Sequence, residues 1–367
     1  MHSYTRPDAT TPVKIPQTQT AAVVPVLGAK PEIRNDVPVK QPSQLAPGEC
    51  LVKIICTGVC HTDLHACRGD WPIKPVTPLI GGHEGVGTIV AIGAHTKDSP
   101  VKVGQRVGIK WLANSCLDCE QCRTGLEQCC RQAKCSGLTV DGTFSQYAVS
   151  WVQHVTPIPE PLDSQAAASI LCAGLTVYRA LKYSGARIGN WVVLPGAGGG
   201  LGHLAVQYAV AMGMRVVAID TGAEKKNLCM TLGAEKWIDF KETQDIVGAI
   251  KEACDGQGAH CAVVTTATSA GYAQAIDYLR PGGSLMAVGL PGCANLESSI
   301  FWTVVKSISI LGSYVGNRQD AVEALEIAAA GKVVVKYQLR SLSQLEEVYD
   351  GLAEGKIAGR IVLEVTQ

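Results

Sequence analysis

The chain has 367 residues, more than one hydrophobic core usually fills, so we expect two domains. Hydrophobic residues make up 47% of it and charged residues 17%, while 32 basic and 32 acidic side chains cancel to a formal charge of zero. This balance excludes the strong positive field of a protein that binds nucleic acid or a membrane surface, and no run of about 18 apolar residues predicts a membrane span.

The first twenty or so residues, MHSYTRPDATTPVKIPQTQT, are rich in Thr, Pro and Gln. They contain no apolar run like that of a secretory signal and only one arginine, unlike a good mitochondrial presequence, so we expect a loose extension over 1–20. Fifteen cysteines without a signal peptide indicate a reducing compartment, which favours a cytoplasmic protein whose clustered thiols bind metal.

Two early segments carry a candidate catalytic metal site: GVCHTDLHACRGDW (58–71) and GGHEGVG (81–87). They supply a thiol, Cys60, and an imidazole, His83; a third candidate ligand is Cys172, in ILCAGLTVY. Two cysteines and one histidine leave one corner of a tetrahedral zinc ion free for water or substrate, which is the arrangement that catalytic zinc needs.

Two carboxylates flank these candidate ligands. Asp63 is placed to accept the second imidazole proton of His83 and so to orient that ring; a local turn or a helix cap is the alternative. Glu84 is either an alternative metal ligand or a buried, paired carboxylate.

The densest cysteine cluster follows, CLDCEQCRTGLEQCC (116–130). Four thiolates on one short loop suit a closed tetrahedral zinc site, which braces the loop and leaves no position for a substrate. Iron–sulfur ligation and free buried cysteines are the alternatives. Cys129 could replace its neighbour Cys130, and Cys135 is a weaker candidate. The predicted ligands of this structural zinc are Cys116, Cys119, Cys122 and Cys130.

The segment WVVLPGAGGGLGHLAVQYAVAMGMRVVAID (191–220) predicts a strand, a glycine-rich turn, a helix and a second strand. Glycines at such a turn let the backbone approach a pyrophosphate at the helix N-terminus. The spacing departs from G-x-G-x-x-G. Gly199 and Gly202 occupy the second and third positions, Ala197 takes the first, and Gly196 precedes it.

An acid ends the second strand, 18 residues after Gly202. Asp220 would bind the ribose hydroxyls of the adenosine and repel the 2′-phosphate of NADP, so the sequence predicts NAD as the cofactor. Lys225 either touches the same ribose or is an ordinary surface lysine.

Further strands are expected at 262–268, 283–290 and 307–316, because each is nearly continuous in apolar residues. Near the C-terminus, apolar residues at helical spacing predict one face of a core helix: Leu345, Val348, Tyr349 and Leu352. The chain therefore reads as an α/β protein with a β-rich first part, a doubly wound parallel sheet and a short return segment that completes the first part.

Several of these stretches together resemble zinc-dependent medium-chain alcohol dehydrogenases, especially the yeast and fungal ethanol-type enzymes. The resemblance runs from about residue 50 to the C-terminus. It rests on CHTDLHA, GGHEGVG, the C-x2-C-x2-C-x7-C loop, ILCAGLTVY, GLGHLAVQYA and SISILGSYVGNR.

The resemblance implies a GroES-like catalytic domain, 1–174 with 316–367, and a Rossmann NAD-binding domain, 175–315. It implies catalytic zinc on Cys60, His83 and Cys172, and structural zinc on the four cysteines of the 116–130 loop. A homotetramer or a homodimer is also implied.

The same resemblance assigns roles around the cofactor. His61 and Arg360 would face the pyrophosphate, Thr176 would lie near the nicotinamide, and Thr62 and His65 would form a proton relay. The residues implied to bind NAD are His61, Thr176, Gly196, Gly199, Gly200, Leu201, Gly202, Asp220, Lys225, Val288 and Arg360. The residues implied to line the alcohol pocket are Trp71, Trp111 and Leu290.

Three positions depart from the family pattern: Cys67 stands where an aromatic is familiar, Arg68 where histidine is frequent, and Leu290 where methionine is familiar. None is a proposed ligand, so the expected reaction is unchanged: small primary alcohols, ethanol foremost, interconverted with aldehydes by hydride transfer to and from NAD. The alternatives are aromatic or secondary alcohols, formaldehyde adducts, or a non-catalytic protein that binds zinc and NAD.

Overall fold

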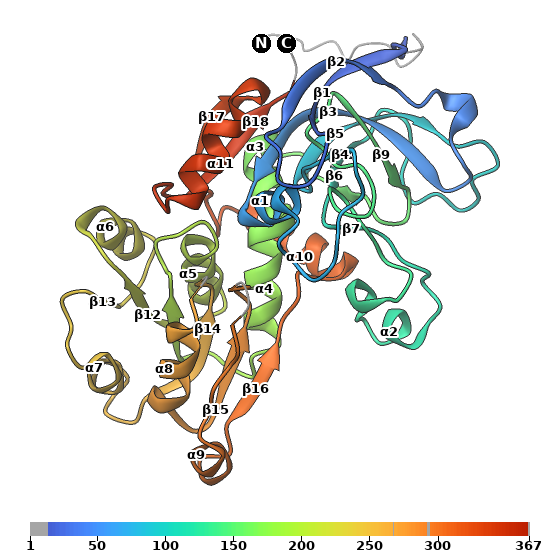
Figure 1. Ribbon diagram of the computed structural model, residues 1–367. Coiled ribbons are helices and arrows are strands. Elements are labelled where there is room, and N and C mark those ends of the chain that lie inside the picture. The colour runs from blue at the N-terminus through green and yellow to red at the C-terminus, as the bar shows by residue number, and fades with distance from the viewer. Residues whose placement is uncertain (1–13, 267, 292–293, 366–367) are drawn as a thin grey trace, which may run out of the picture.

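A six-stranded parallel sheet organises the middle of the chain, in a computed structural model that describes residues 14–266, 268–291 and 294–365 (Figure 1). The strand order is β13-β12-β11-β14-β15-β16, the 3-2-1-4-5-6 order of a doubly wound fold. Successive strands are added on one side of β11 up to β13 and on its other side from β14 onward, so the strand order reverses between β11 and β14. Its strands are β11 (Trp191–Pro195), β12 (Arg215–Asp220), β13 (Lys236–Asp239), β14 (Ala259–Val264), β15 (Leu279–Ala287) and β16 (Ser309–Gly312).

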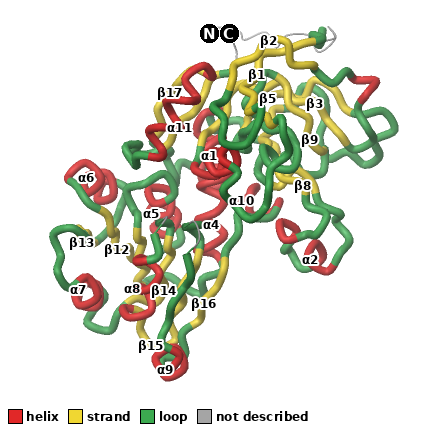
Figure 2. Tube along the Cα trace, in the orientation of Figure 1, coloured by secondary structure: helices red, strands yellow, loops and turns green. Residues whose placement is uncertain are grey.

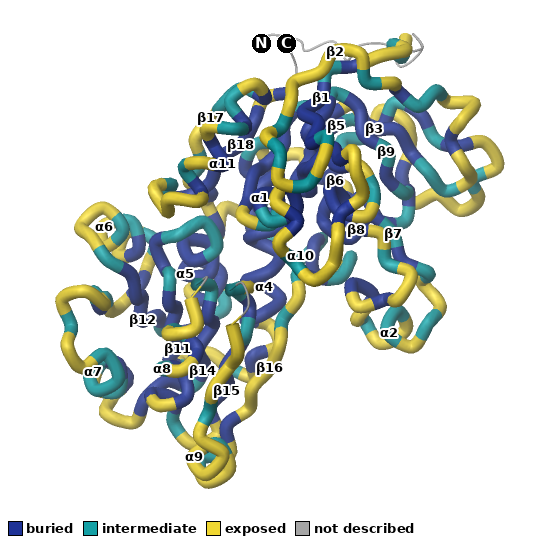
Figure 3. The backbone as a smooth tube through the Cα atoms, in the orientation of Figure 1, coloured by how far each residue is buried: buried dark blue, intermediate teal, exposed yellow. Residues whose placement is uncertain are grey.

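A helix that precedes the first strand, α4, and helices between the strands cover both faces of the sheet, as a parallel sheet requires. They are α4 (Leu175–Lys182), α5 (Gly202–Ala211), α6 (Ala223–Thr231), α7 (Ile246–Ala253), α8 (Ala270–Tyr278) and α9 (Ile300–Val305). The central strands are therefore largely apolar: Val192, Val216 and Cys261 are fully buried, whereas the edge strand β16 is exposed. Figure 3 shows that α4 and α5 are buried together with the central strands, while α6, α7 and α9 are more exposed.

A seven-stranded sheet organises the second lobe, which we call the N-terminal lobe (Figure 2). Its strands are β3 (Glu49–Val59), β5 (Gly85–Ile92), β6 (Arg106–Ile109), β9 (Tyr147–Trp151), β10 (Thr156–Pro157), β17 (Tyr337–Ser341) and β18 (Arg360–Glu364). Two smaller sheets accompany it: β1 (Thr18–Val24) with β2 (Glu32–Pro38) and β4 (Leu79–Ile80), and β7 (Leu112–Asn114) with β8 (Lys134–Cys135).

The C-terminal return segment belongs to this N-terminal lobe. β18 pairs antiparallel with β3, Ile361 lying opposite Val59, and β17 pairs parallel with β18. The remaining helices are α1 (His61–Arg68), α2 (Glu120–Arg123), α3 (Ser164–Ser169), α10 (Arg318–Ala329) and α11 (Leu345–Ala353). On α11 the predicted apolar face is buried. The exact domain limits at 174, 175, 315 and 316 stay a prediction.

The predicted loose extension is wrong at its C-terminal end. Residues 1–13 lie outside the described residues, but Thr18–Thr20 already form part of β1. Gln19 is buried because its side-chain oxygen accepts a hydrogen bond from the Tyr147 N–H at 2.6 Å. Polar composition suggested a loose segment, whereas pairing across the chain makes it a strand.

The predicted strands lie where expected, with limits shifted by several residues. The segment at 262–268 becomes β14, which ends at Val264, and residue 267 lies outside the described part. The segments at 283–290 and 307–316 become β15 and the shorter β16. Across the described ranges, no helix combines the length and the apolar character needed to cross a membrane.

Candidate metal and cofactor site

Cys60 lies at the junction of β3 and α1, where it is the N-cap residue of the helix. Its Sγ accepts from the Thr62 N–H at 3.3 Å, and Asp63 Oδ2 accepts from the Cys60 N–H at 2.9 Å. Cys60 and Asp63 form a capping box, which fixes the backbone at Cys60. The helix-cap interpretation of Asp63 is therefore realised, but by only one of its two oxygens.

The other oxygen of Asp63 orients His83. Its Oδ1 lies 2.7 Å from His83 Nδ1, and both side chains are almost fully buried. A carboxylate accepts here, so Nδ1 carries the proton and Nε2 is left as an electron-pair donor. The Asp63 carboxylate thus holds both Cys60 and His83 in place.

His83 Nε2 points at two sulfurs: it lies 3.5 Å from Cys60 Sγ and 3.2 Å from Cys172 Sγ. Cys172 comes from a π-helical turn, Ile170–Gly174, between α3 and α4. Tetrahedral zinc with Zn–S near 2.3 Å and Zn–N near 2.0 Å holds its ligand atoms roughly 3.5 to 3.8 Å apart. Two thiols and one imidazole at these separations fit a zinc ion.

Glu84 joins the same group, since one atom from each of Cys60, His83, Glu84 and Cys172 lies within 4.8 Å of the others. Its Oε1 is 3.9 Å from His83 Nε2, but both of its oxygens contact the Arg360 guanidinium. Burial raises the pKa of Glu84 to about 7, although Arg360 acts in the opposite direction. In this structure Glu84 is a buried, paired carboxylate next to the three candidate ligands.

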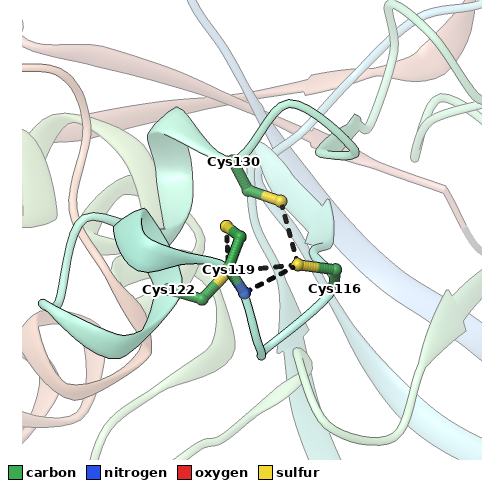
Figure 4. A group of neighbouring side chains, drawn as sticks. All are labelled: Cys116, Cys119, Cys122 and Cys130. Atoms are coloured by element: carbon green, nitrogen blue, oxygen red, sulfur yellow. Dashed lines mark hydrogen bonds between the residues drawn. The ribbon is translucent and has the colours of Figure 1, made fainter.

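The cysteine loop (residues 116–130) brings four thiols together by local structure alone (Figure 4). Sγ of Cys116 is 3.9 Å from that of Cys122 and 3.6 Å from that of Cys130, and Cys119 lies 3.5 Å from Cys122. These separations suit a closed four-sulfur zinc site.

Two open questions about this loop are decided by geometry. Cys129 is exposed and lies outside the group, and Cys135 is buried on β8, also outside it. The loop backbone supports a thiolate as well: the N–H groups of Asp118 and Cys119 lower the pKa of Cys116 to about 6.

The glycine-rich turn after β11 needs its glycines for space. Gly196 has a φ of +80°, and a Cβ on Gly202 would lie 2.0 Å from the Gly196 carbonyl oxygen. Gly199 N–H donates to that same carbonyl at 3.1 Å, and Leu201 precedes the first residue of α5. Only glycine at 202 lets the helix start against the turn.

Asp220 ends β12 beside this turn. Its Oδ2 accepts from the Gly198 N–H at 3.0 Å, and its Oδ1 accepts from Lys225 Nζ at 2.9 Å. The strand order places this carboxylate at the C-terminal edge of the sheet, next to the point where the order reverses. Lys225 therefore reaches Asp220 directly and is not an isolated surface lysine.

Arg360 approaches the turn from the N-terminal lobe. A Cβ on Gly200 would lie 3.4 Å from its Nη1, so the guanidinium packs against the turn. His61 instead places Nε2 3.1 Å from the Leu352 carbonyl oxygen, to which it donates. Thr176 and Val288 are buried, on α4 and just after β15.

One indole, Trp111, lies beside the His83 ring, and a second, Trp71, lies beside Trp111. The Trp111 ring is 5.3 Å from His83 and 6.3 Å from Trp71, in edge-to-face arrangements near 80°. His65 stacks on Trp71 at 5.1 Å. Leu290 is 56% exposed.

Three contacts at the site were not anticipated from sequence. His65 Nδ1 lies 2.8 Å from Asp70 Oδ1, the Trp111 Nε1–H donates to the Tyr314 hydroxyl, and Glu84 pairs with Arg360. Only the first has a local signal, since Asp70 follows His65 by five residues. The other two join residues separated by 203 and 276 positions.

Comparison with known proteins gives matches along nearly the whole chain. Residues 46–160 match the alcohol dehydrogenase GroES-like domain, and residues 200–330 match the zinc-binding dehydrogenase family. An alcohol dehydrogenase of Schizosaccharomyces pombe is 48% identical over 354 residues, covering 96% of this chain and 99% of that one. Alcohol dehydrogenase 1 of Neurospora crassa is 46% identical, with 96% and 99% covered.

Solved structures match the fold as well. The alcohol dehydrogenase of the archaeon Aeropyrum pernix superposes with a TM-score of 0.84 at 30% identity, covering 94% of this chain and 99% of that one. An acetophenone reductase from Geotrichum candidum, solved in complex with NAD, gives 0.83 at 28% identity, with 96% and 98% covered.

Proposed function

The chain belongs to the zinc-dependent medium-chain alcohol dehydrogenases, an NAD-dependent enzyme family, and on that premise we propose that it interconverts small primary alcohols, ethanol foremost, and their aldehydes. The observation that carries the proposal is the meeting of Cys60, His83 and Cys172 around one point, with Asp63 behind the imidazole. Three protein ligands leave a fourth position for the substrate oxygen.

Each cofactor has a defined chemical task. Zinc supplies a Lewis acid that lowers the pKa of an alcohol, and NAD supplies the hydride acceptor. We propose that Cys60, His83 and Cys172 hold this zinc, while Cys116, Cys119, Cys122 and Cys130 hold the structural one. The glycine-rich turn, Asp220 and Arg360 would then bind NAD.

Thr62 and His65 are proposed to move the alcohol proton to solvent. They lie three residues apart on α1 and so share a face of that helix. His65 is partly exposed, and its Nδ1 contact with Asp70 leaves Nε2 free to exchange a proton with water.

Trp71 and Trp111 support the preference for small substrates. Trp111 is buried next to His83, and Trp71 meets it edge-on. Two indoles near the ligand group limit the volume available to an alcohol chain, whereas aromatic or secondary alcohols would need more room.

The test is metal analysis combined with NAD-linked turnover of the intact protein and of Cys172→Ser. We expect about two zinc ions per chain in the wild type and about one in the variant, with turnover reduced on the order of a thousandfold. Cys261→Ser, which changes another fully buried thiol, should keep both zinc ions and most turnover. Full turnover by Cys172→Ser would refute the ligand assignment. Faster turnover of benzyl alcohol or 2-propanol than of ethanol would refute the substrate proposal.

We also propose a homotetramer. The edge strand β16 and helix α9 expose apolar side chains, including Ile300, Phe301 and Leu311. An unpaired apolar edge of this kind favours pairing with another copy. Sedimentation velocity would test the state, and a monomer at micromolar concentration would exclude it.

For location we propose the cytoplasm. The fourteen cysteines of the described residues are all free thiols, a state that a reducing compartment maintains. Fluorescent tagging in a fungal cell would test this, and a signal confined to an organelle would contradict it.

A further inference from the structure

His203, in the first turn of α5, is fully buried and makes two hydrogen bonds. Its Nδ1 lies 3.1 Å from the Gly199 carbonyl oxygen, and its Nε2 lies 3.3 Å from the Lys336 N–H. A carbonyl only accepts and an N–H only donates, so a neutral ring protonated on Nδ1 satisfies both contacts. Burial lowers the pKa of His203 to about 4, which keeps this neutral form at physiological pH.

Gln207, one helical turn after His203 and on the same face of α5, makes a second connection to the segment that contains Lys336. Its Oε1 accepts from the Val334 N–H at 2.7 Å, and its Nε2 donates to the Val334 carbonyl at 2.9 Å. The segment that receives these bonds, 334–336, leads directly into β17 of the N-terminal lobe. The helix that starts at the glycine-rich turn is therefore tied to the other lobe.

The connection continues to Arg360. The Lys336 carbonyl accepts from the Arg360 N–H at 2.9 Å, and Gly359 allows this close approach, because a Cβ there would lie 2.4 Å from the same oxygen. The Arg360 guanidinium then packs against Gly200. Hydrogen bonds thus run from the turn through His203 and Lys336 to the Arg360 backbone, and the packing of the Arg360 side chain against Gly200 closes the circuit.

We propose that His203 is a positioning residue for NAD, which fixes the separation between the glycine-rich turn and the Arg360 guanidinium. The inference rests on the proposed function, in which these two elements hold the cofactor pyrophosphate. We call the hydrogen bonds between the His203 ring and the Gly199 carbonyl and Lys336 N–H the His203 bridge. With the bridge intact, the turn amides and the guanidinium are already placed before the cofactor arrives, so little ordering is needed on binding. Without it, among the described residues, only the two Gln207 bonds to Val334 connect α5 with the 334–336 segment, so the separation is less closely fixed and cofactor binding must order it.

The test measures NADH affinity by fluorescence titration and AMP affinity by calorimetry. His203→Ala loses both ring hydrogen bonds, but only the one from the Lys336 N–H joins the lobes, so NADH binding should weaken about five- to tenfold, the worth of one buried hydrogen bond, while AMP binding and zinc content stay nearly unchanged. AMP contains the adenosine half but lacks the second phosphate. Tyr208→Phe is the matched control, since it removes a buried hydrogen bond from the same helix, to the Ala324 carbonyl at 2.8 Å, without touching the bridge.

Two conservative variants test separately the two hydrogen bonds of the bridge, to Gly199 and to Lys336. His203→Gln places an acceptor near the former Nε2 and should recover most of the NADH affinity. His203→Asn restores only the donor toward Gly199 and should bind NADH as weakly as His203→Ala. This pair decides the question even if the alanine variant does not fold.

Equal NADH affinity in the Gln and Asn variants, or equal weakening of NADH and AMP, would overturn the proposal and leave His203 a packing residue. Wild-type protein that binds no NADH would instead refute the proposed function.

Discussion

The two metal sites of this protein are built in opposite ways. The cysteine loop draws its four ligands from fifteen consecutive residues and needs only a short helix and two turns to bring them together. The proposed catalytic site draws Cys60, His83 and Cys172 from a strand end, a loop and a π-helical turn spread over more than a hundred residues. The first site can form wherever its loop folds, whereas the second exists only in the assembled N-terminal lobe.

The two sites also differ in how deeply their candidate ligands are buried. Three of the four loop cysteines are partly exposed, while Cys60, His83, Glu84 and Cys172 are all buried. A buried, low-dielectric site strengthens the electrostatic effect of a metal on a substrate, and a peripheral closed site can only hold chain segments together. Changes in the two sites should therefore damage different properties.

After the loss of turnover expected for Cys172→Ser, the largest effect should come from Asp63→Asn. An amide cannot accept both from the Cys60 N–H and from His83 Nδ1, so catalytic zinc affinity should fall about 10- to 100-fold. Competition with a chelator measures this affinity. Asp141→Asn, whose carboxylate accepts from the Ile80 N–H, is the control and should bind zinc normally. Equal affinities in the two variants would contradict the role of Asp63.

Removing a ligand from the cysteine loop should lower the stability of the protein and leave its turnover largely unchanged. Cys122→Ser should lose about one zinc per chain and lower the unfolding midpoint by roughly 10 °C, because structural zinc contributes folding free energy. Turnover at 25 °C should stay within about twofold of wild type. Calorimetry and steady-state assays check both halves. Lost turnover in protein that remains folded would show that the two sites are not separable.

Next in size is the pocket effect of Trp71. Trp71→Ala should raise the activity on longer or branched alcohols relative to ethanol by about tenfold, since an indole volume becomes available. The ratio of kcat/KM values measures it. Trp302, a half-exposed indole on α9, provides the control, and Trp302→Ala should keep the wild-type ratio. An unchanged ratio in Trp71→Ala would remove this residue from the pocket.

The smallest effect concerns Lys110, which directly follows β6. It is buried, its Nζ donates to the His154 carbonyl and to Thr156 Oγ1, and burial lowers its pKa from 10.5 to about 8. Because the unfolded chain then binds more protons between pH 8 and 10.5, this residue makes stability rise with pH in that window, by at most about 1.4 kcal/mol per unit.

Lys110→Met should flatten this rise, and urea unfolding at pH 8 and pH 10 measures the difference. The exposed Lys102→Met variant should keep the wild-type slope. Identical slopes in all three proteins would show that Lys110 does not titrate in the window.

Much of this fold could be predicted from the sequence, because local sequence patterns determine local structure. The spacing of the loop cysteines, the glycines that follow an apolar strand and the acid that ends the next strand are each determined by short-range geometry. The limits of β16 and of the N-terminal strand were missed because they depend on pairing with distant partners.

The sequence by itself determined which residues could bind zinc and NAD, since ligand type and short spacings are written in the chain. Tertiary structure alone decided that Glu84 pairs with Arg360, that Trp111 meets Tyr314, and that His203 reaches Lys336. Each of these contacts joins segments more than a hundred residues apart. Their formation depends on how the two lobes and the C-terminal return pack, and no short stretch of sequence encodes that packing.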